Sequence, residues 1–146
     1  MLFRSWGDPS LYESTLNVVQ EIAARGEVDF EYEVIPGVSS VHALAARHRI
    51  ALNRVGRAVQ ITPARLLSAG MPADVDDVVV MLDAHATFAT IPPAGIDIYW
   101  GAYLGTPDEM LRSGPLAETA AEIVRVRDEA KERKGWMFDT YLLRRR

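Results

Sequence analysis

The sequence of 146 residues contains no cysteine. This absence excludes a disulfide framework, a zinc site built from thiolates and a cysteine nucleophile. Long apolar runs are missing too, since even the run from Val78 to Leu82 is far shorter than the roughly 18 residues that a membrane span needs. Residues 1–4 lead directly to Gly7 and leave no room for a signal peptide. We therefore expect a cytoplasmic protein with no membrane partner.

The composition is that of an ordinary globular protein. Hydrophobic residues make up 49% of the chain, charged residues 25%, and the mean hydropathy is −0.01. These values exclude a disordered or collagen-like chain. The length suits one domain or two small sub-domains.

Carboxylates are absent between Glu33 and Asp74, although the net charge of the chain is −4. The arginines in this interval are Arg47, Arg49, Arg54, Arg57 and Arg65. A basic interval within an acidic protein is more typical of a site for a small anion than of nucleic-acid binding. No aromatic residue is interleaved to stack on bases, so we expect no nucleic-acid partner. A solvated arginine face remains the alternative.

The hydrophobic pattern alternates between strand and helix signals, which predicts the α/β fold class. In the first part of the chain we expect strands over residues 1–6 and 28–34, and helices over 11–25 and 39–47. The loop of residues 53–56 is the expected boundary between two sub-domains, 1–55 and 56–146.

In the second part we expect strands over residues 58–62, 77–82, 95–102 and 136–143. A short helix is expected from Pro63 to Gly70, and a long one from Gly114-Pro115 to Gly135. The run of residues 78–82 is apolar throughout, which is typical of a strand covered on both faces.

Two glycine-containing loops each separate an expected strand from an expected helix. They are Gly7-Asp8-Pro9 and Pro36-Gly37-Val38-Ser39-Ser40. If both strands are parallel, both loops lie at the carboxyl edge of the sheet, where ligands bind. Glycine lets the backbone come close to a ligand, and the backbone N–H groups at the start of the following helix can bind an anion. The Asp8 carboxylate could accept a hydrogen bond from a ribose hydroxyl or an amino group. Neither loop is a phosphate-binding or dinucleotide fingerprint. Ordinary turns remain the alternative.

Histidines supply the remaining candidates for chemistry. His85 follows Asp83 in the loop after residues 78–82, and the two are our weak candidates for acid–base groups. A lone loop histidine is more often inert. His42 and His48 lie six residues apart, on different sides of a helix, so we expect no metal site.

Five segments together resemble the tetrapyrrole (corrin/porphyrin) methylase family. In order they are GDPSLY from Gly7, IPGVSS from Ile35, VVML from Val79, YWGAYLGTPDE from Tyr99 and GWMFDTY from Gly135. The resemblance covers essentially the whole chain. The first two motifs are shared across the family, and the last two indicate a carbon methyltransferase of cobalamin synthesis; another methylase of the family remains an alternative.

The resemblance implies binding of S-adenosylmethionine between two domains and methyl transfer to a tetrapyrrole substrate rich in carboxylates. It also implies a possible homodimer. The positions that match cofactor contacts in the family are Gly7, Asp8, Leu11, Ser39, Ser40, Met81, Trp100 and Met137. The arginines that we expect to clamp substrate carboxylates are Arg47 and Arg54.

One departure from the family concerns the start of the sequence. The family carries a strand, a glycine-rich turn and about half a domain before the Gly-Asp-Pro loop, and nothing here matches them. We therefore expect either a fragment or a gene whose start has been misassigned: the latter part of a Rossmann-like parallel-sheet domain followed by a mixed-sheet α/β domain. Alone, it should bind the cofactor poorly and be inactive. The sequence is also compatible with a non-catalytic anion-binding fragment or with a folded remnant that has no activity.

Overall fold

The computed structural model describes residues 3–4 and 6–146. Residues 1–40 and residues 41–146 group into two compact units, which we call the first and second units. We describe each unit by itself. The sub-domain boundary predicted near Val55 stays a prediction.

The first unit holds helix α1 (Thr15–Arg25), and the helix α2 (Ser40–His48) begins at its last residue. Glu13 Oε1 accepts hydrogen bonds from the Thr15 backbone N–H (2.9 Å) and hydroxyl (2.6 Å), so α1 begins later than predicted. It ends at Gly26, whose positive φ of 67° suits a helix C-terminus. No residue of α1 is buried.

The two strands predicted for the first unit are not present in its described part. Residues 1, 2 and 5 of the first strand lie outside the described residues, and residues 3, 4 and 6 are not in a strand. Residues 29–39 have no regular secondary structure, so the prediction of a strand over 28–34 was wrong. Alternating side chains set which face can be buried, but a strand also needs a hydrogen-bonded neighbour. None is found among the described residues of this unit.

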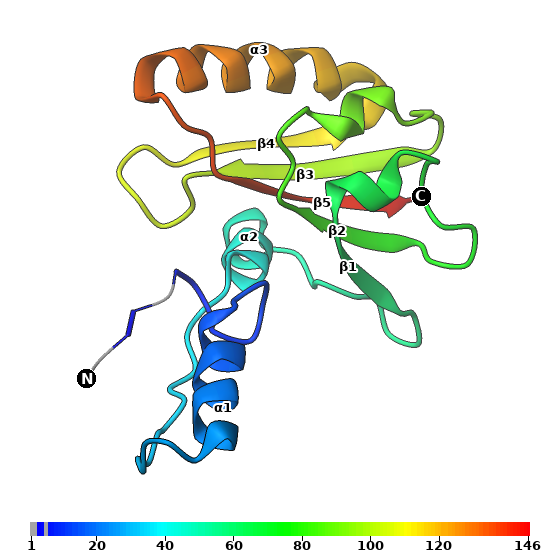
Figure 1. Ribbon diagram of the computed structural model, residues 1–146. Coiled ribbons are helices and arrows are strands. Elements are labelled where there is room, and N and C mark those ends of the chain that lie inside the picture. Colours follow the sequence, from blue (N-terminus) through cyan, green and yellow to red (C-terminus); the bar gives the residue numbers. More distant parts are fainter. Residues whose placement is uncertain (1–2, 5) are drawn as a thin grey trace. The chain divides into compact units, whose positions relative to one another are not determined.

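The second unit contains one mixed five-stranded sheet (Figure 1). Its strands are β1 (Val59–Pro63), β2 (Asp77–Met81), β3 (Ile96–Ala102), β4 (Met110–Pro115) and β5 (Asp139–Arg145). Their order is β1-β2-β5-β3-β4. β1 and β2 are parallel and the other neighbours are antiparallel, which confirms the predicted mixed-sheet α/β domain.

Helices cover both faces of this sheet. Helix α3 (Leu116–Lys134) lies along one face and α2 on the other (Figure 1). On the α3 side, Ile98 and Trp100 of β3 join a core that includes Ile123. On the α2 side, a Cβ added to Gly101 would lie 2.9 Å from Leu44 Cδ1, so glycine lets the helix pack closely. Residues 78–80 of β2 are fully buried, as the apolar run predicts.

Several local predictions for the second unit need correction. Strand β4 was not predicted because it ends in Gly114 and Pro115; both are tolerated at the edge of a sheet, where β4 lies. The helix expected over residues 63–70 is the 3₁₀ helix η1 (Ala64–Leu67), and a second, η2 (Thr87–Thr90), was missed. β5 begins three residues later than predicted. In the part of the chain that the structure describes, no helix is both long and apolar enough to cross a membrane.

Candidate ligand site and the network behind the loop after β2

The two glycine-containing loops of the first unit lie side by side. Asp8 Oδ2 accepts a hydrogen bond from the Gly37 backbone N–H (2.9 Å). Asp8 Oδ1 accepts from the backbone N–H (2.8 Å) and the hydroxyl of Ser10. One carboxylate therefore shapes its own loop and ties it to the second loop, 29 residues further along the chain.

Glycine is required where the loops meet. A Cβ on Gly37 would lie 2.1 Å from the Gly7 carbonyl oxygen, so no larger residue fits there. Gly7 has a φ of +80°, which L side chains rarely adopt, and a Cβ on it would lie 3.5 Å from Ser39 Cα. The expected juxtaposition of the loops is present. Because both Asp8 oxygens accept bonds within the unit, Asp8 acts first as a tie between the loops.

The remaining predicted cofactor positions are distributed over both units. Leu11 is half-buried just before α1, Ser39 is buried, and Ser40 opens α2. In the second unit, Met81 is the half-buried last residue of β2, and Met137 is half-buried just before β5.

The polar groups of Trp100 already have partners within the protein. Its ring is fully buried in β3, and its indole N–H donates to Asp139 Oδ2 (2.9 Å). Its backbone oxygen lies 3.0 Å from His48 Nε2. A backbone contact from Trp100 to a ligand would therefore have to share this oxygen with His48.

Both predicted substrate arginines are paired with carboxylates of the second unit. Arg47 Nε lies 2.8 Å from Glu109 Oε1, and Arg54 Nε lies 3.3 Å from Asp77 Oδ2. Burial raises the pKa of Glu109, but hydrogen bonds from the Gly105 N–H and from Arg47 outweigh it and the pKa is lowered. A substrate carboxylate would have to compete with these acids for the two guanidinium groups.

Asp83 is buried within the loop after β2, where its carboxylate is well supplied with donors. It accepts from the backbone N–H groups of His85 (3.0 Å) and Thr87 (2.7 Å), and from the Tyr141 hydroxyl (2.7 Å). Burial, followed by the Asp83 charge, raises the pKa of Tyr141, so this hydroxyl remains a donor. The Asp83 carboxylate is therefore occupied by these donors, whereas His85, the other acid–base candidate, is exposed.

A second charged group behind this loop was missed from the sequence. Arg127 of α3 is 4% exposed, and its Nε donates to Asp139 Oδ2 (3.0 Å). Its other nitrogens donate to the backbone oxygens of Asp83 and Ala84. Burial raises the pKa of Asp139, while Arg127 opposes that change. A signal was available, because Arg127 lies on the same helix face as the apolar Ile123.

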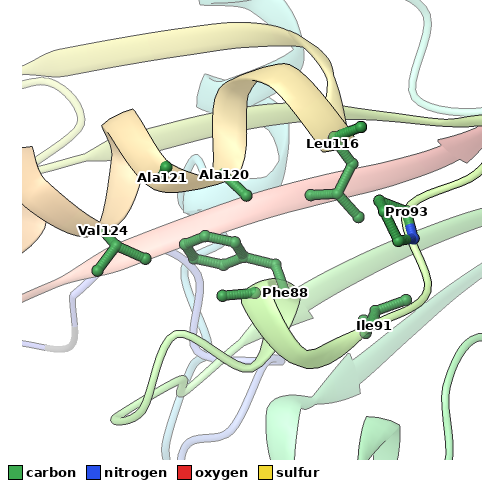
Figure 2. Close-up of a pocket in the computed structure, with 9 residues that line it drawn as sticks. Phe88, Ile91, Pro93, Leu116, Ala120, Ala121 and Val124 are labelled. Carbon is green, nitrogen blue, oxygen red and sulfur yellow. The ribbon is translucent and has the colours of Figure 1, made fainter.

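An apolar pocket of about 310 Å³ lies between η2 and α3 (Figure 2). It is lined by Phe88, Ala89, Ile91, Pro93, Leu116, Ala117, Ala120, Ala121 and Val124. It contains no charged side chain, so it does not suit a ligand rich in carboxylates. Among the described residues, no three His, Asp or Glu side chains gather in a way that could hold a metal ion.

The sequence profile of the tetrapyrrole (corrin/porphyrin) methylases matches residues 1–120. The chain belongs to this family. A curated relative from Sinorhizobium sp, named precorrin-6A synthase [deacetylating], is 48% identical over 143 residues. The match covers 98% of this chain but 55% of that relative, so the chain spans about half the relative's length.

Solved structures agree with this assignment. A cobalamin-synthesis-related protein (CobF) from Corynebacterium diphtheriae has 37% identity and a TM-score of 0.91, over 97% of this chain and 59% of its own. Uroporphyrin-III C-methyltransferase from Thermus thermophilus, solved with S-adenosyl homocysteine, has 21% identity and a TM-score of 0.62, over 94% of this chain and 62% of its own. This second likeness concerns the fold alone.

Proposed function

We propose that this chain is part of an S-adenosylmethionine-dependent methyltransferase of cobalamin synthesis, which methylates C-1 of precorrin-5 with deacetylation. Its products would be precorrin-6A, acetate and S-adenosylhomocysteine. The observation that carries the proposal is 48% identity, across nearly the whole chain, to a relative named for this activity. Because the chain spans about half of that relative, "complete enzyme" below means this chain together with the further length that its relatives have.

The paired loops of the first unit fit a cofactor with a flat, polar nucleoside. Gly7 and Gly37 leave no Cβ between the loops, so the two main chains lie in close contact and both loops can contribute to one ligand site. Gly7, Asp8, Ser39 and Ser40 would provide polar contacts from these loops. The apolar contacts would come from Leu11, Met81 and Met137, with Trp100 contributing its backbone. When bound, the cofactor supplies an activated methyl group on a sulfonium, so this part of the reaction needs no strong base.

The chain's own part in the methyl step is to align two reactants and exclude water. Deacetylation differs, because a water molecule must attack a carbonyl and an acid–base group would help. We assign this part to His85, the exposed candidate. Replacing His85 by alanine in the complete enzyme should slow acetate release, and unchanged release would remove His85 from the mechanism.

Arg47 and Arg54 are the proposed clamps for substrate carboxylates. Each shielded, charge-assisted contact should contribute about 1.5–3 kcal/mol of binding free energy. Alanine at both positions should weaken binding of the tetrapyrrole to the complete enzyme. Arg57→Ala is the matched control, since Arg57 is an exposed arginine of the same interval, paired with Asp76 at 3.3 Å. Equal affinities of double variant and control would contradict the clamp.

The activity itself is tested by incubating the complete enzyme with precorrin-5 and a methyl-labelled cofactor. We expect the label at C-1 and one acetate for each methyl transferred. Label on a different ring carbon would identify another methylase of the family, and binding of the tetrapyrrole without turnover would identify an anion-binding protein. The 146-residue chain alone should bind the cofactor weakly, and tight binding in calorimetry would contradict that expectation. Formation of a homodimer stays a prediction for light scattering.

A further inference from the structure

The loop that follows β2 contains two residues in an unfavourable backbone conformation. Leu82 has a φ of 56° and Ala86 a φ of 55°, in the left-handed region that glycine or asparagine normally occupies. Such residues persist only where the surrounding structure enforces them. Leu82 is also 56% exposed, so neither local conformation nor burial explains a leucine at this position.

The loop is held from within by one buried carboxylate. Asp83 binds the backbone N–H groups of His85 and Thr87 and the Thr87 hydroxyl (3.0 Å). The Tyr141 hydroxyl of β5 donates to the same carboxylate, at 2.7 Å. The Tyr141 ring is itself fixed, edge-on to Phe88 with centroids 5.2 Å apart.

The loop is held a second time from helix α3. The Arg127 guanidinium donates to the backbone oxygens of Asp83 and Ala84 and is paired with Asp139. Asp139 also accepts from the indole of Trp100 in β3. A buried ion pair stabilises a core no better than apolar packing does. Its evident effect here is geometric, because it joins α3, β3 and β5 to a single loop.

We propose that Leu82 is an apolar contact for the adenosyl part of the methyl donor, and that Asp83, supported by Tyr141 and Arg127, is the positioning residue that presents it. Leu82 directly follows the predicted contact Met81, at the carboxyl end of β2. β2 is parallel to β1, and ligands of such sheets bind beyond the carboxyl ends of parallel strands. This inference rests on the proposed function.

The first test changes Leu82 itself. Leu82→Gly relieves the positive φ, so the free energy of unfolding should be unchanged or higher. Loss of the apolar contact should nevertheless weaken binding of S-adenosylhomocysteine by about tenfold. Binding is followed in the ¹⁵N-labelled 146-residue chain by amide chemical shifts during titration. An unchanged dissociation constant for Leu82→Gly would overturn the inference.

The second test removes the hydroxyl that anchors Asp83. Tyr141→Phe keeps the ring against Phe88, and it should speed amide hydrogen exchange at Thr87 about tenfold and weaken ligand binding. The matched control is Tyr99→Phe, a tyrosine of the neighbouring strand β3 on the other face of the sheet. The control should change neither quantity. A looser loop with unchanged affinity would reduce Asp83 to a structural residue and overturn its positioning role.

The same titration separates this inference from the proposed function. Saturable shifts at Asp8, Gly37 and Leu82 support both. Shifts at Asp8 and Gly37, with none at Met81 or Leu82, overturn the inference and leave the function standing. No shift at any amide of the complete enzyme, labelled and titrated in the same way to millimolar ligand, contradicts the function and the inference together. If Tyr141→Phe fails to fold, Leu82→Gly still decides whether Leu82 is a ligand contact.

Discussion

Sequence segments with a strand-like pattern are buried in a sheet in the second unit of the chain but remain exposed in the first. In the second unit, the strand residues Val79 and Leu142 are fully buried within the sheet. In the first unit, Phe30, Tyr32 and Val34 alternate with acids as a strand should, yet they are 37%, 49% and 46% exposed. The comparison teaches that a pattern of side chains selects a face for burial, while neighbouring strands decide whether burial occurs.

This difference bears on what the first unit needs in order to function. Its candidate loops are already tied together by Asp8, but the segment between α1 and the second loop has no strand partner within the described residues. The relatives have further length that this chain does not span. Because its core is larger and its strands are paired, we expect the second unit to be the more stable part of this chain.

The largest effect should come from the buried charges of the second unit. Arg127→Met leaves the Asp139 carboxylate buried without its cation, so the free energy of unfolding should fall by about 3–5 kcal/mol. The measurement is urea denaturation followed by circular dichroism. Arg125→Ala is the control: Arg125 pairs with Glu129 on the exposed side of the same helix, and the change should cost about 0.5 kcal/mol or less. Equal effects would show that the buried network is not coupled to folding.

A matched pair of truncations compares the two units directly. Leu143→Ala removes a fully buried side chain of β5 and should lower the free energy of unfolding by about 2–5 kcal/mol. Val34→Ala in the first unit should change it by about 0.5 kcal/mol or less, because that side chain is already exposed. A large effect of Val34→Ala would mean that residues 28–34 are packed in this chain, and the comparison would fail.

Gly37→Ala should disturb the first unit alone. The new Cβ would overlap the Gly7 carbonyl oxygen, so the two loops should separate, at a cost of about 1–3 kcal/mol. Faster amide exchange at Ser10, whose N–H donates to Asp8, would report the change. Val38→Ala in the same loop, at a side chain that is 73% exposed, serves as the control. Faster exchange at β2 amides would contradict an effect confined to the first unit.

The smallest effect concerns pH. Hydrogen bonds from Gly105 and Arg47 outweigh burial and lower the pKa of Glu109 in the folded protein below its ordinary value of 4.5. Glu109 therefore stabilises the fold above that pH, and its contribution is lost as the pH falls through the lowered pKa. Melting temperatures between neutral and acidic pH should fall less for Glu109→Gln than for the parent chain. Parallel curves would show that Glu109 has no such part.

The sequence was a good guide wherever local chemistry sets the structure. The apolar run of β2, the glycine at the end of α3 and the glycines of the two loops each indicate a definite backbone feature, and each feature is present. Edge strand β4 gave a weak signal because it ends in Gly114 and Pro115, which are typical of turns. The strand expected over residues 28–34 is not formed, because no described strand lies beside it to supply hydrogen bonds.

The supporting network could not be predicted from local patterns. Arg127 shares a helix face with the apolar Ile123, which indicates that it is buried, but nothing in the local sequence indicates that it meets Asp83 and Asp139. Their meeting depends on how α3 lies across the sheet. The same limit applies to Arg47 and Arg54: an interval without carboxylates does not reveal that Glu109 and Asp77 supply them from elsewhere in the chain.

The central claim is that two distant loops, joined through Asp8 and Gly37, form one binding site for the methyl donor. The most direct measurement is a titration of the ¹⁵N-labelled chain with S-adenosylhomocysteine, in parallel with Gly37→Ala. The account predicts saturable shifts of the Gly7, Asp8 and Ser39 amides that are lost in the variant. Binding that leaves these amides unmoved, or that Gly37→Ala does not weaken, would contradict it.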